Sequence, residues 1–283
     1  MNKKFNFSTM VLWAGLVFLY LPMLILMLYS FNDSRLVTVW GGFSTKWYFE
    51  LFKDDQMLAA VWASLRIAFM SASSAVVLGT IAAFVMVRFG RFKGHTLFGG
   101  MLTAPLVMPE VITGLSLLLL FVSLEQMIGW PAERGVTTIW IAHTTFCTAY
   151  VAIIVNARLR EMDLSVEEAA MDLGATPVKV FFQILVPIIA PALLSGWLLA
   201  FTLSLDDLVI ASFVSGPGAS TLPMVVFSSV RMGVSPQINA LATLIILAVS
   251  LLVFLGWWVS RRAEQKTQRE MKEVMEQTDP LGH

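Results

Sequence analysis

Six long stretches of apolar residues, separated by shorter polar segments, form the dominant pattern of the chain. They lie near residues 11–31, 60–87, 97–122, 137–157, 184–205 and 240–260. A helix needs about 20 mostly apolar residues to cross a bilayer. The pattern therefore predicts an all-α integral membrane protein with about six transmembrane helices.

Prolines interrupt several of these stretches, at Pro22, Pro105, Pro109 and Pro191. Transmembrane helices tolerate proline because neighbouring helices can satisfy the backbone groups that it leaves free. Pro105 and Pro109 stand four residues apart in the third stretch, so we expect a bend there. Such a bend fits a moving gate and a static kink equally well.

The first apolar stretch follows a basic start and resembles a signal sequence only superficially. A signal peptide has an apolar core of about 7–15 residues and a cleavage site of small residues. Residues 11–31 are longer than that and lack an A-x-A pattern. We therefore expect a retained spanning helix.

Lysine and arginine are distributed unevenly between the two sides of the predicted spans. With the N-terminus inside, thirteen of the 19 fall in inner segments and five in outer ones, with Arg66 left inside the second span. Inner loops carry the excess of Lys and Arg in membrane proteins. The sequence thus predicts that both termini, including the polar tail 263–283, are cytoplasmic.

Composition supports this class and excludes others. The chain has 283 residues, of which 57% are hydrophobic and 13% charged, and its net charge is zero. A soluble domain has about 25% charged residues. Nothing in the charge suggests a nucleic acid partner. The single cysteine, Cys147, cannot form an internal disulfide.

Between the fourth and fifth spans, an acidic segment interrupts the apolar pattern on the predicted inner side. Ser165 and Glu168 have the spacing of a capping box. Gly174 suits the left-handed position that ends a helix. Thr176 and Pro177 then have the order expected at the start of the next helix. The sequence predicts a short helix, a glycine stop and a second helix leading into the fifth span.

The predicted short helix has a narrow apolar face made of Val166, Ala169, Ala170 and Leu173. A helix of about two turns is barely stable alone and needs a surface to pack against. That surface belongs either to another protein or to the chain's own spans. The residues alone leave both alternatives open.

The spacing of Glu168, Ala169, Ala170, Gly174 and Pro187 resembles the cytoplasmic E-A-A motif of permease subunits in binding-protein-dependent ABC importers. The resemblance implies a type I importer permease fold over residues 1–262. It also implies that a coupling loop, near residues 158–182, docks on an ATPase subunit through Glu168, Ala169, Ala170 and Gly174.

Two further segments, residues 105–121 and 204–243, resemble the polyamine permeases of that family, most closely the putrescine permeases. The resemblance implies a bacterial inner membrane location, a second homologous permease subunit, two ATPase subunits and a periplasmic substrate-binding protein. The chain has no G-x-x-x-x-G-K-[ST] phosphate loop. We therefore expect ATP to bind only to the partner ATPase subunits and no cofactor to bind this chain.

Acidic residues in or near spans are costly, so they are candidates for a substrate path. Glu110, Asp206 and Asp207 could attract a cation, and Tyr150 could add a cation–π contact. Each has an alternative: Glu110 could pair with Arg66, and the aspartates could lie among lipid headgroups or cap the segment that follows. His143 is expected to hydrogen-bond to a neighbouring helix.

Two other classes of protein are alternatives to an importer permease. An intramembrane enzyme needs convergent catalytic groups, and the sequence has no H-E-x-x-H or G-x-S-x-G motif. An ion-driven secondary transporter often shows inverted repeats, and none is evident here. The acidic candidates favour a cationic substrate but do not distinguish putrescine from spermidine.

Overall fold

Helices make up nearly all of the regular structure in a computed structural model of the chain. The structure describes residues 7–36, 39–90, 92–233, 235–251, 254, 258 and 261. Within these ranges, the β-structure is limited to one isolated bridge between Asn32 and Phe43. The predicted all-α class is confirmed.

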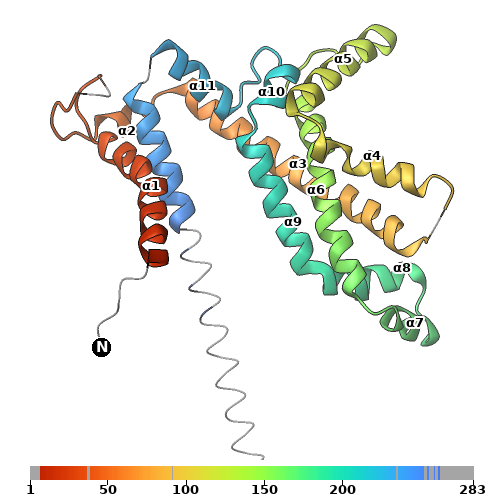
Figure 1. Ribbon diagram of the computed structural model, residues 1–283. Helices are drawn as coiled ribbons and strands as arrows, with labels where there is room; N and C mark the ends of the chain where they lie inside the picture. The colour runs from red at the N-terminus through yellow and green to blue at the C-terminus, as the bar shows by residue number, and fades with distance from the viewer. Residues whose placement is uncertain are drawn as a thin grey trace, which may run out of the picture. The chain divides into compact units, whose positions relative to one another are not determined.

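The described residues form two compact units, and Figure 1 shows the elements of both. One unit comprises residues 55–231, and the other comprises the described parts of 1–54 and 232–283. The first of these contains most of the apolar core and all of the candidate site residues. Each unit is described by itself below.

The terminal unit contains α1 (Phe7–Tyr29), α2 (Lys46–Leu51) and an apolar helix over Pro236–Leu251. No residue of α1 is buried, so its apolar side chains remain free for lipid or a partner chain. The loop after α1 folds around buried Asn32, whose side chain donates to the Val39 carbonyl and accepts from the Gly41 N–H, each at 2.7 Å.

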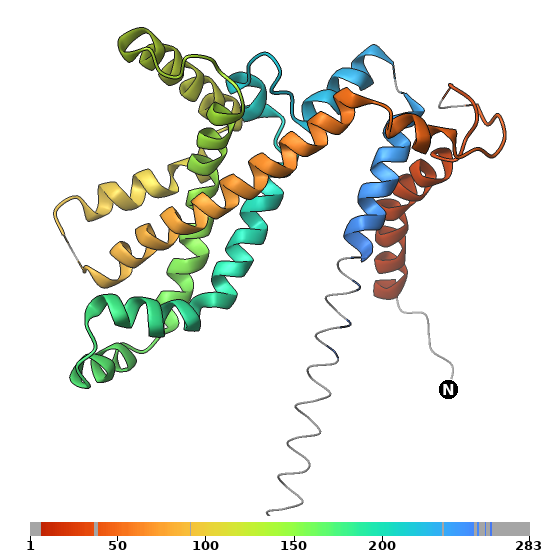
Figure 2. The same cartoon turned by 180° about the vertical axis from the view of Figure 1, so that it is seen from behind.

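Three helices form the centre of the larger unit: α3 (Asp55–Arg88), α6 (Val136–Glu161) and α9 (Val186–Asp206). Figure 2 shows them crossing closely when the molecule is seen from behind. The buried face of α3 consists mostly of small residues, which let helix backbones approach in a membrane. Those residues are Ala60, Ser64, Ala68, Ser71, Ala72, Ala75, Gly79, Thr80, Ala82 and Ala83.

Val151 of α6 illustrates this close packing. A Cβ added to Gly79 of α3 would lie 2.9 Å from the Val151 side chain, and one added to Gly196 of α9 would lie 3.4 Å from it. Two glycines on separate helices therefore make room for one buried valine. The three helices are packed too tightly at this level for independent movement of one side chain.

The predicted third span is not one helix, and this prediction was wrong. The structure has α4 (His95–Val107) and α5 (Glu110–Ile128), separated by extended backbone at Met108, where φ is −74° and ψ is 136°. The ring of Pro109 disfavours the helical conformation for the residue before it, so the helix ends there. Pro105 stays within α4.

Four of the other five predicted spans are confirmed with shifted ends, and α5 covers part of the predicted third span. Five described helices are long and apolar enough to cross a membrane: Phe7–Tyr29, Asp55–Arg88, Glu110–Ile128, Val136–Glu161 and Pro177–Asp206. The predicted sixth span corresponds to Pro236–Leu251, and most of its remainder lies outside the described residues. The predicted tail, 263–283, also lies outside them.

Short helices occupy the two ends of the larger unit. At one end, α10 (Val209–Val214) packs on α5, where Gly114 leaves space for Phe213 and Ile210. The helix α11 (Leu222–Met232) follows a turn at Gly218, where φ is +75°.

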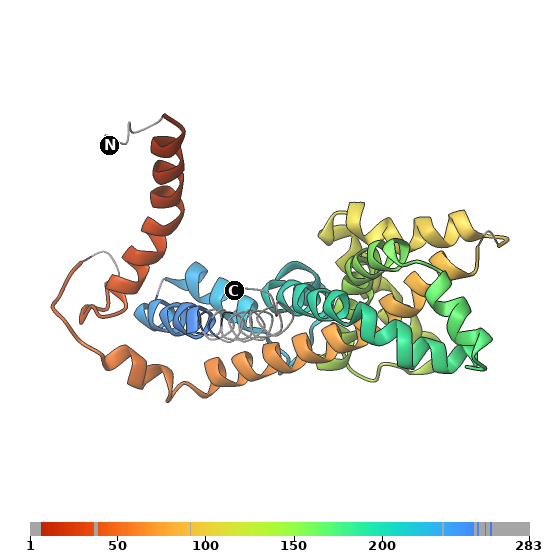
Figure 3. The ribbon, with the colours of Figure 1, turned by 90° about the horizontal axis from the view of Figure 1, so that it is seen from below.

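At the other end, α7 (Ser165–Asp172), α8 (Pro177–Val180) and the π-helix η1 (Phe181–Leu185) connect α6 to α9. Figure 3 looks at the molecule from below, so that this end of the larger unit faces the viewer. The helix runs without a break from Pro177 to Asp206. No loop therefore interrupts the backbone between α8 and α9.

Candidate functional site

The helix α7 starts differently from the prediction, and no capping box forms. Leu164 precedes the helix in helical conformation, and no side chain caps it. Instead, the Ser165 N–H donates to the Asp163 carboxylate at 3.0 Å. Asp bonds readily to backbone two residues ahead, so it captures this N–H before Glu168 can act in a box. The same hydrogen bond lowers the pKa of Asp163.

The end of α7 matches the prediction. Gly174 has a φ of +85°, in the left-handed region that disfavours side chains. Its N–H donates to the Met171 carbonyl at 2.9 Å, and the Ala175 N–H donates to the Ala170 carbonyl at 3.0 Å. These two bonds make a Schellman motif. The turn is therefore fixed by a glycine-specific conformation.

The next helix also begins as predicted. Thr176 is extended at the cap, and Pro177 is the first residue of α8. Proline is favoured there because its missing N–H would have no partner in the first turn. The two helices α7 and α8 are thus separated by four residues, Leu173 to Thr176.

The predicted apolar face of α7 does not pack on the chain's own helices. Leu173 is 90% exposed and Val166 is 42% exposed. Ala169 is also exposed, and Ala170 is partly buried. Glu168 lies exposed on the same short helix. The surface of α7 therefore exposes apolar side chains and, at a different position around the helix, the Glu168 carboxylate.

Glu167, the residue before Glu168, faces the C-terminal end of α3. Its Oε1 lies 2.6 Å from Nη2 of Arg88, the last residue of α3. The two side chains are only 12% and 10% exposed. Consecutive carboxylates on α7 thus point in different directions, Glu167 toward α3 and Glu168 outward.

Aromatic contacts join the same region of α3 to the start of the fifth span. The rings of Phe84 and Phe181 meet edge to face at 5.1 Å between centroids. A cavity of about 300 Å³ lies beside them, lined also by Pro177, Val178 and Phe182. The coupling loop therefore rests on α3 through one ion pair and one apolar contact.

At the opposite end of the unit, Asp207 belongs to a buried hydrogen-bond network. Its carboxylate accepts from His143 Nε2 at 3.0 Å and from the N–H groups of Ile210 and Ala211 at 3.3 and 2.8 Å. His143 Nδ1 lies 2.7 Å from the Ser204 hydroxyl. Asp207 therefore caps α10 and joins α6 to the end of α9, and the predicted helix-to-helix role of His143 is confirmed.

The other predicted path residues lie on three different helices. Asp206 is exposed at the last position of α9, and Glu110 is exposed at the first position of α5. Tyr150 is partly buried in α6, with its ring 5.1 Å from that of Phe146. No ion pair or hydrogen bond joins any two of the four predicted path residues, all of which the structure describes.

The suggested pairing of Glu110 with Arg66 is not formed. Neither residue takes part in an ion pair in the described part of the chain. Arg66 instead borders a cavity of about 570 Å³ whose other walls are apolar and aromatic, including Trp62, Phe69 and Trp197. The two charges are held by separate elements, α5 and α3.

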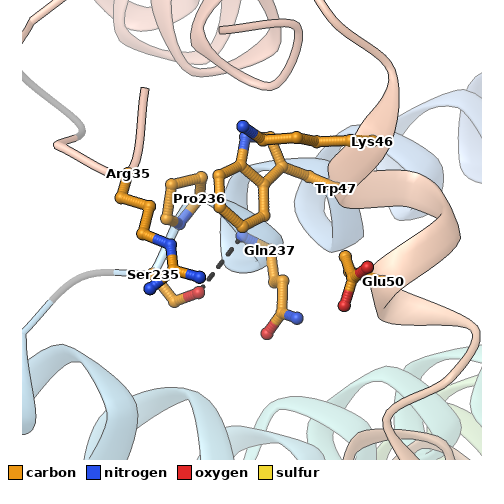
Figure 4. Close-up of a pocket in the computed structure, with 7 residues that line it drawn as sticks. All are labelled: Arg35, Lys46, Trp47, Glu50, Ser235, Pro236 and Gln237. Carbon is orange, nitrogen blue, oxygen red and sulfur yellow. Dashed lines mark hydrogen bonds between the residues drawn. The ribbon is translucent and has the colours of Figure 1, made fainter. Parts of the chain in front are cut away.

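A pocket of about 540 Å³ lies in the terminal unit, and Figure 4 shows its lining residues. Arg35 and Glu50 stand on opposite sides of it. Lys46 pairs with Asp33 at 2.6 Å, which lowers the pKa of Asp33, and its ammonium lies over the Trp47 ring. The lining therefore combines charges of both signs.

Sequence reasoning missed the pairing of Arg88 with Glu167. The available signal was an arginine at the end of an apolar stretch and two adjacent glutamates in a short helix. Pairing them required the tertiary arrangement, because nothing in the spacing brings α3 next to α7.

Comparison with known proteins agrees with this architecture. Residues 75–269 match the family described as binding-protein-dependent transport system inner membrane component. The chain is 66% identical over 262 residues to the putrescine transport system permease protein PotI of Escherichia coli K12, covering 93% of each chain. It is 38% identical to the spermidine/putrescine transport system permease protein PotC of the same organism, covering 86% of this chain and 90% of that one.

Solved structures show the same fold at low sequence identity. A chain of a bacterial ABC transporter that imports the acidic polysaccharide alginate matches with a TM-score of 0.69 and 14% identity, covering 90% of this chain and 94% of that one. A chain of the methionine ABC transporter MetNI matches with a TM-score of 0.57 and 18% identity, covering 73% and 95%.

The relatives are transport permeases, so this chain is a transport component and not an enzyme. Its apolar helices make it a multi-pass protein of the inner membrane. Because the family model matches well over half of the chain, the protein belongs to the family of inner membrane components of binding-protein-dependent transport systems.

Proposed function

We propose that this chain forms half of the translocation path of a putrescine importer, together with a second homologous permease. Sequence identity of 66% to a putrescine permease over 93% of both chains supports putrescine as the substrate. Two ATPase subunits and a periplasmic binding protein complete the proposed complex. Residues 1–262 would form its permease domain and 263–283 its cytoplasmic tail.

The observation that carries the coupling role is the exposed outer surface of α7. Val166 is an exposed apolar side chain on a helix of eight residues that cannot be stable alone, and Leu173 is exposed directly after it. Glu168 is also exposed on this helix, and Gly174 fixes the turn that follows. We infer that Glu168, Ala169 and Ala170 dock on the ATPase, which places this loop and both termini in the cytoplasm.

The substrate assignment is tested on the purified complex. We expect putrescine-loaded binding protein to stimulate its ATPase more strongly than spermidine-loaded binding protein at equal concentrations. Stimulation by spermidine alone would contradict the assignment to putrescine and favour a spermidine importer. A complex that purifies without any ATPase chain, and takes up polyamine on an ion gradient, would contradict the whole proposal.

For the substrate path, the structure favours Asp206 over Asp207 as the residue that meets the cation. Asp206 is exposed, whereas the Asp207 carboxylate is engaged by three donors in the interior. Glu110 and Tyr150 remain in the proposal as further path residues. Asp207 would act through the position of α10.

Asp206→Asn is expected to lower putrescine uptake by about tenfold, since one lost charge–charge contact is worth roughly 1–2 kcal/mol at a partly solvated site. Expression and complex assembly should be unchanged because the side chain is exposed. Uptake of labelled putrescine into proteoliposomes measures the effect, and Glu125→Asn, an exposed acid in α5, is the matched control. Wild-type uptake by Asp206→Asn would remove this residue from the path.

A further inference from the structure

We propose that Arg88 and Glu167 are a pair of positioning residues that transmits movement of α7 directly into α3. The proposal rests on the coupling function of α7. The established connections of the loop are covalent, since α7 follows α6 and leads through α8 into α9. Helix α3 lies far away in the sequence, so only side-chain contacts can couple it to the loop.

The pair is a close and buried contact between opposite charges. The Arg88 and Glu167 atoms approach to 2.6 Å, and both side chains are about nine-tenths buried. Nε and Nη2 of Arg88 and Oε1 of Glu167 are buried and make no hydrogen bond to the described residues, so the contact is an ion pair without hydrogen-bond geometry. Glu167 is therefore the group that compensates the buried charge, and charges in a poorly solvated site attract strongly.

The length and packing of α3 suit it to transmit a displacement across the unit. It has 34 residues, about 50 Å at 1.5 Å per residue, and packs along α6 and α9. Its small buried residues lie in close contact with both helices, as at Gly79 and Val151. Because a helix is stiff, a displacement of the inner end of α3 would also displace its other end, on the opposite side of the unit.

The second contact between the loop and α3, Phe84 against Phe181, differs in kind. Apolar rings can slide over each other with little change in energy, because their attraction depends mostly on buried area. A buried ion pair cannot separate without leaving a charge uncompensated. We therefore assign the transmission to Arg88 and Glu167 and not to the aromatic contact.

The experiment measures putrescine imported per ATP hydrolysed by the whole complex in proteoliposomes. Variants are Glu167→Gln, Arg88→Gln, Arg88→Lys and the exchange Arg88→Glu with Glu167→Arg. We expect each glutamine variant to lower this ratio by about tenfold, within the usual range of coupling effects. Arg88→Lys and the exchanged pair should recover most of it.

A matched control is available in the same loop. Arg158 and Glu161 form an ion pair at 3.2 Å, but their side chains are 43% and 68% exposed. Exposed pairs of this kind contribute little. Glu161→Gln should therefore keep the wild-type ratio.

Several outcomes would overturn the proposal. One is a wild-type ratio of putrescine to ATP in both glutamine variants. Another is a ratio in the exchanged pair and in Arg88→Lys that is no higher than in the single glutamine variants. Loss of the assembled complex in every variant would assign the pair to folding alone. The test is separate from that of α7 docking: if Glu168→Lys blocks uptake and the pair variants do not, only the present inference fails.

Discussion

Uptake of putrescine should be abolished by Glu168→Lys while the chain remains folded in the membrane. Glu168 is exposed and makes no ion pair among the described residues, so a change there affects folding by only about 0.5 kcal/mol. The same carboxylate lies on α7, whose surface also exposes the apolar side chain of Val166. Reversing its charge places a lysine in the proposed contact with the ATPase.

The expected size follows from the energetics of interfaces. Removing one partner from a desolvated charge contact costs about 2–5 kcal/mol, equivalent to a factor of about 30 to several thousand in affinity. Retention of the ATPase subunits during affinity purification measures this directly. Glu161→Lys, the same substitution at an exposed position in the preceding helix, is the control and should retain them.

Gly174→Val extends the test to the geometry of the loop. A β-branched residue at a φ of +85° is strained, by roughly 1–2 kcal/mol or more. No atom lies within 4 Å of a Cβ built there, so the effect comes from the backbone and not from a clash. Gly94, at a φ of +90° and equally open, provides a control outside the coupling loop. Full ATPase retention and uptake by both Glu168→Lys and Gly174→Val would contradict the coupling role.

The second large effect is expected at the opposite end of the unit, where Asp207→Ala should destabilise the protein. The substitution removes the acceptor of three donors, His143 Nε2 and the N–H groups of Ile210 and Ala211. The hydrogen bond to His143 joins two transmembrane helices, and such bonds contribute about 0.6–1.7 kcal/mol; loss of a side-chain cap such as that on α10 costs about 0.5–2 kcal/mol. The summed loss is therefore about 1–4 kcal/mol, a considerable fraction of the stability of a folded protein.

Thermal unfolding of the purified complex measures this loss. Ser204→Ala removes a single hydrogen bond to His143 and should lower the midpoint much less. Asp206→Asn, at the neighbouring exposed position, should leave the midpoint at its wild-type value. A midpoint for Asp207→Ala equal to that of Asp206→Asn would show that the network does not stabilise the fold.

Together the two predictions distinguish the two members within each of two pairs of adjacent acidic residues. In each pair the sequence presents two carboxylates as equivalent, Glu167 with Glu168 and Asp206 with Asp207. The structure buries one member of each pair and exposes the other. The buried member holds helices together, and the exposed member is free to meet a partner or a substrate.

Local chemistry accounts for the features that sequence predicted correctly. The apolar stretches became helices because backbone polar groups must be satisfied internally in a bilayer. Gly174 and Pro177 set the turn of the coupling loop because few other residues adopt those conformations at low cost. Pro109 was recognised as a disturbance, although its effect was a full break between α4 and α5 and not a bend.

The sequence by itself determined the class of protein, the positions of four of the six spans and the motif of the coupling loop, since each depends on residues close together in the chain. Only the tertiary structure decided that Glu167 pairs with Arg88, that Asp207 pairs with His143 and that Leu173 stays exposed. Those outcomes depend on which helices pack together. A charged residue has the same neighbours in sequence whether its side chain faces water or an opposite charge on a distant helix. Its burial in the folded structure distinguishes these two environments.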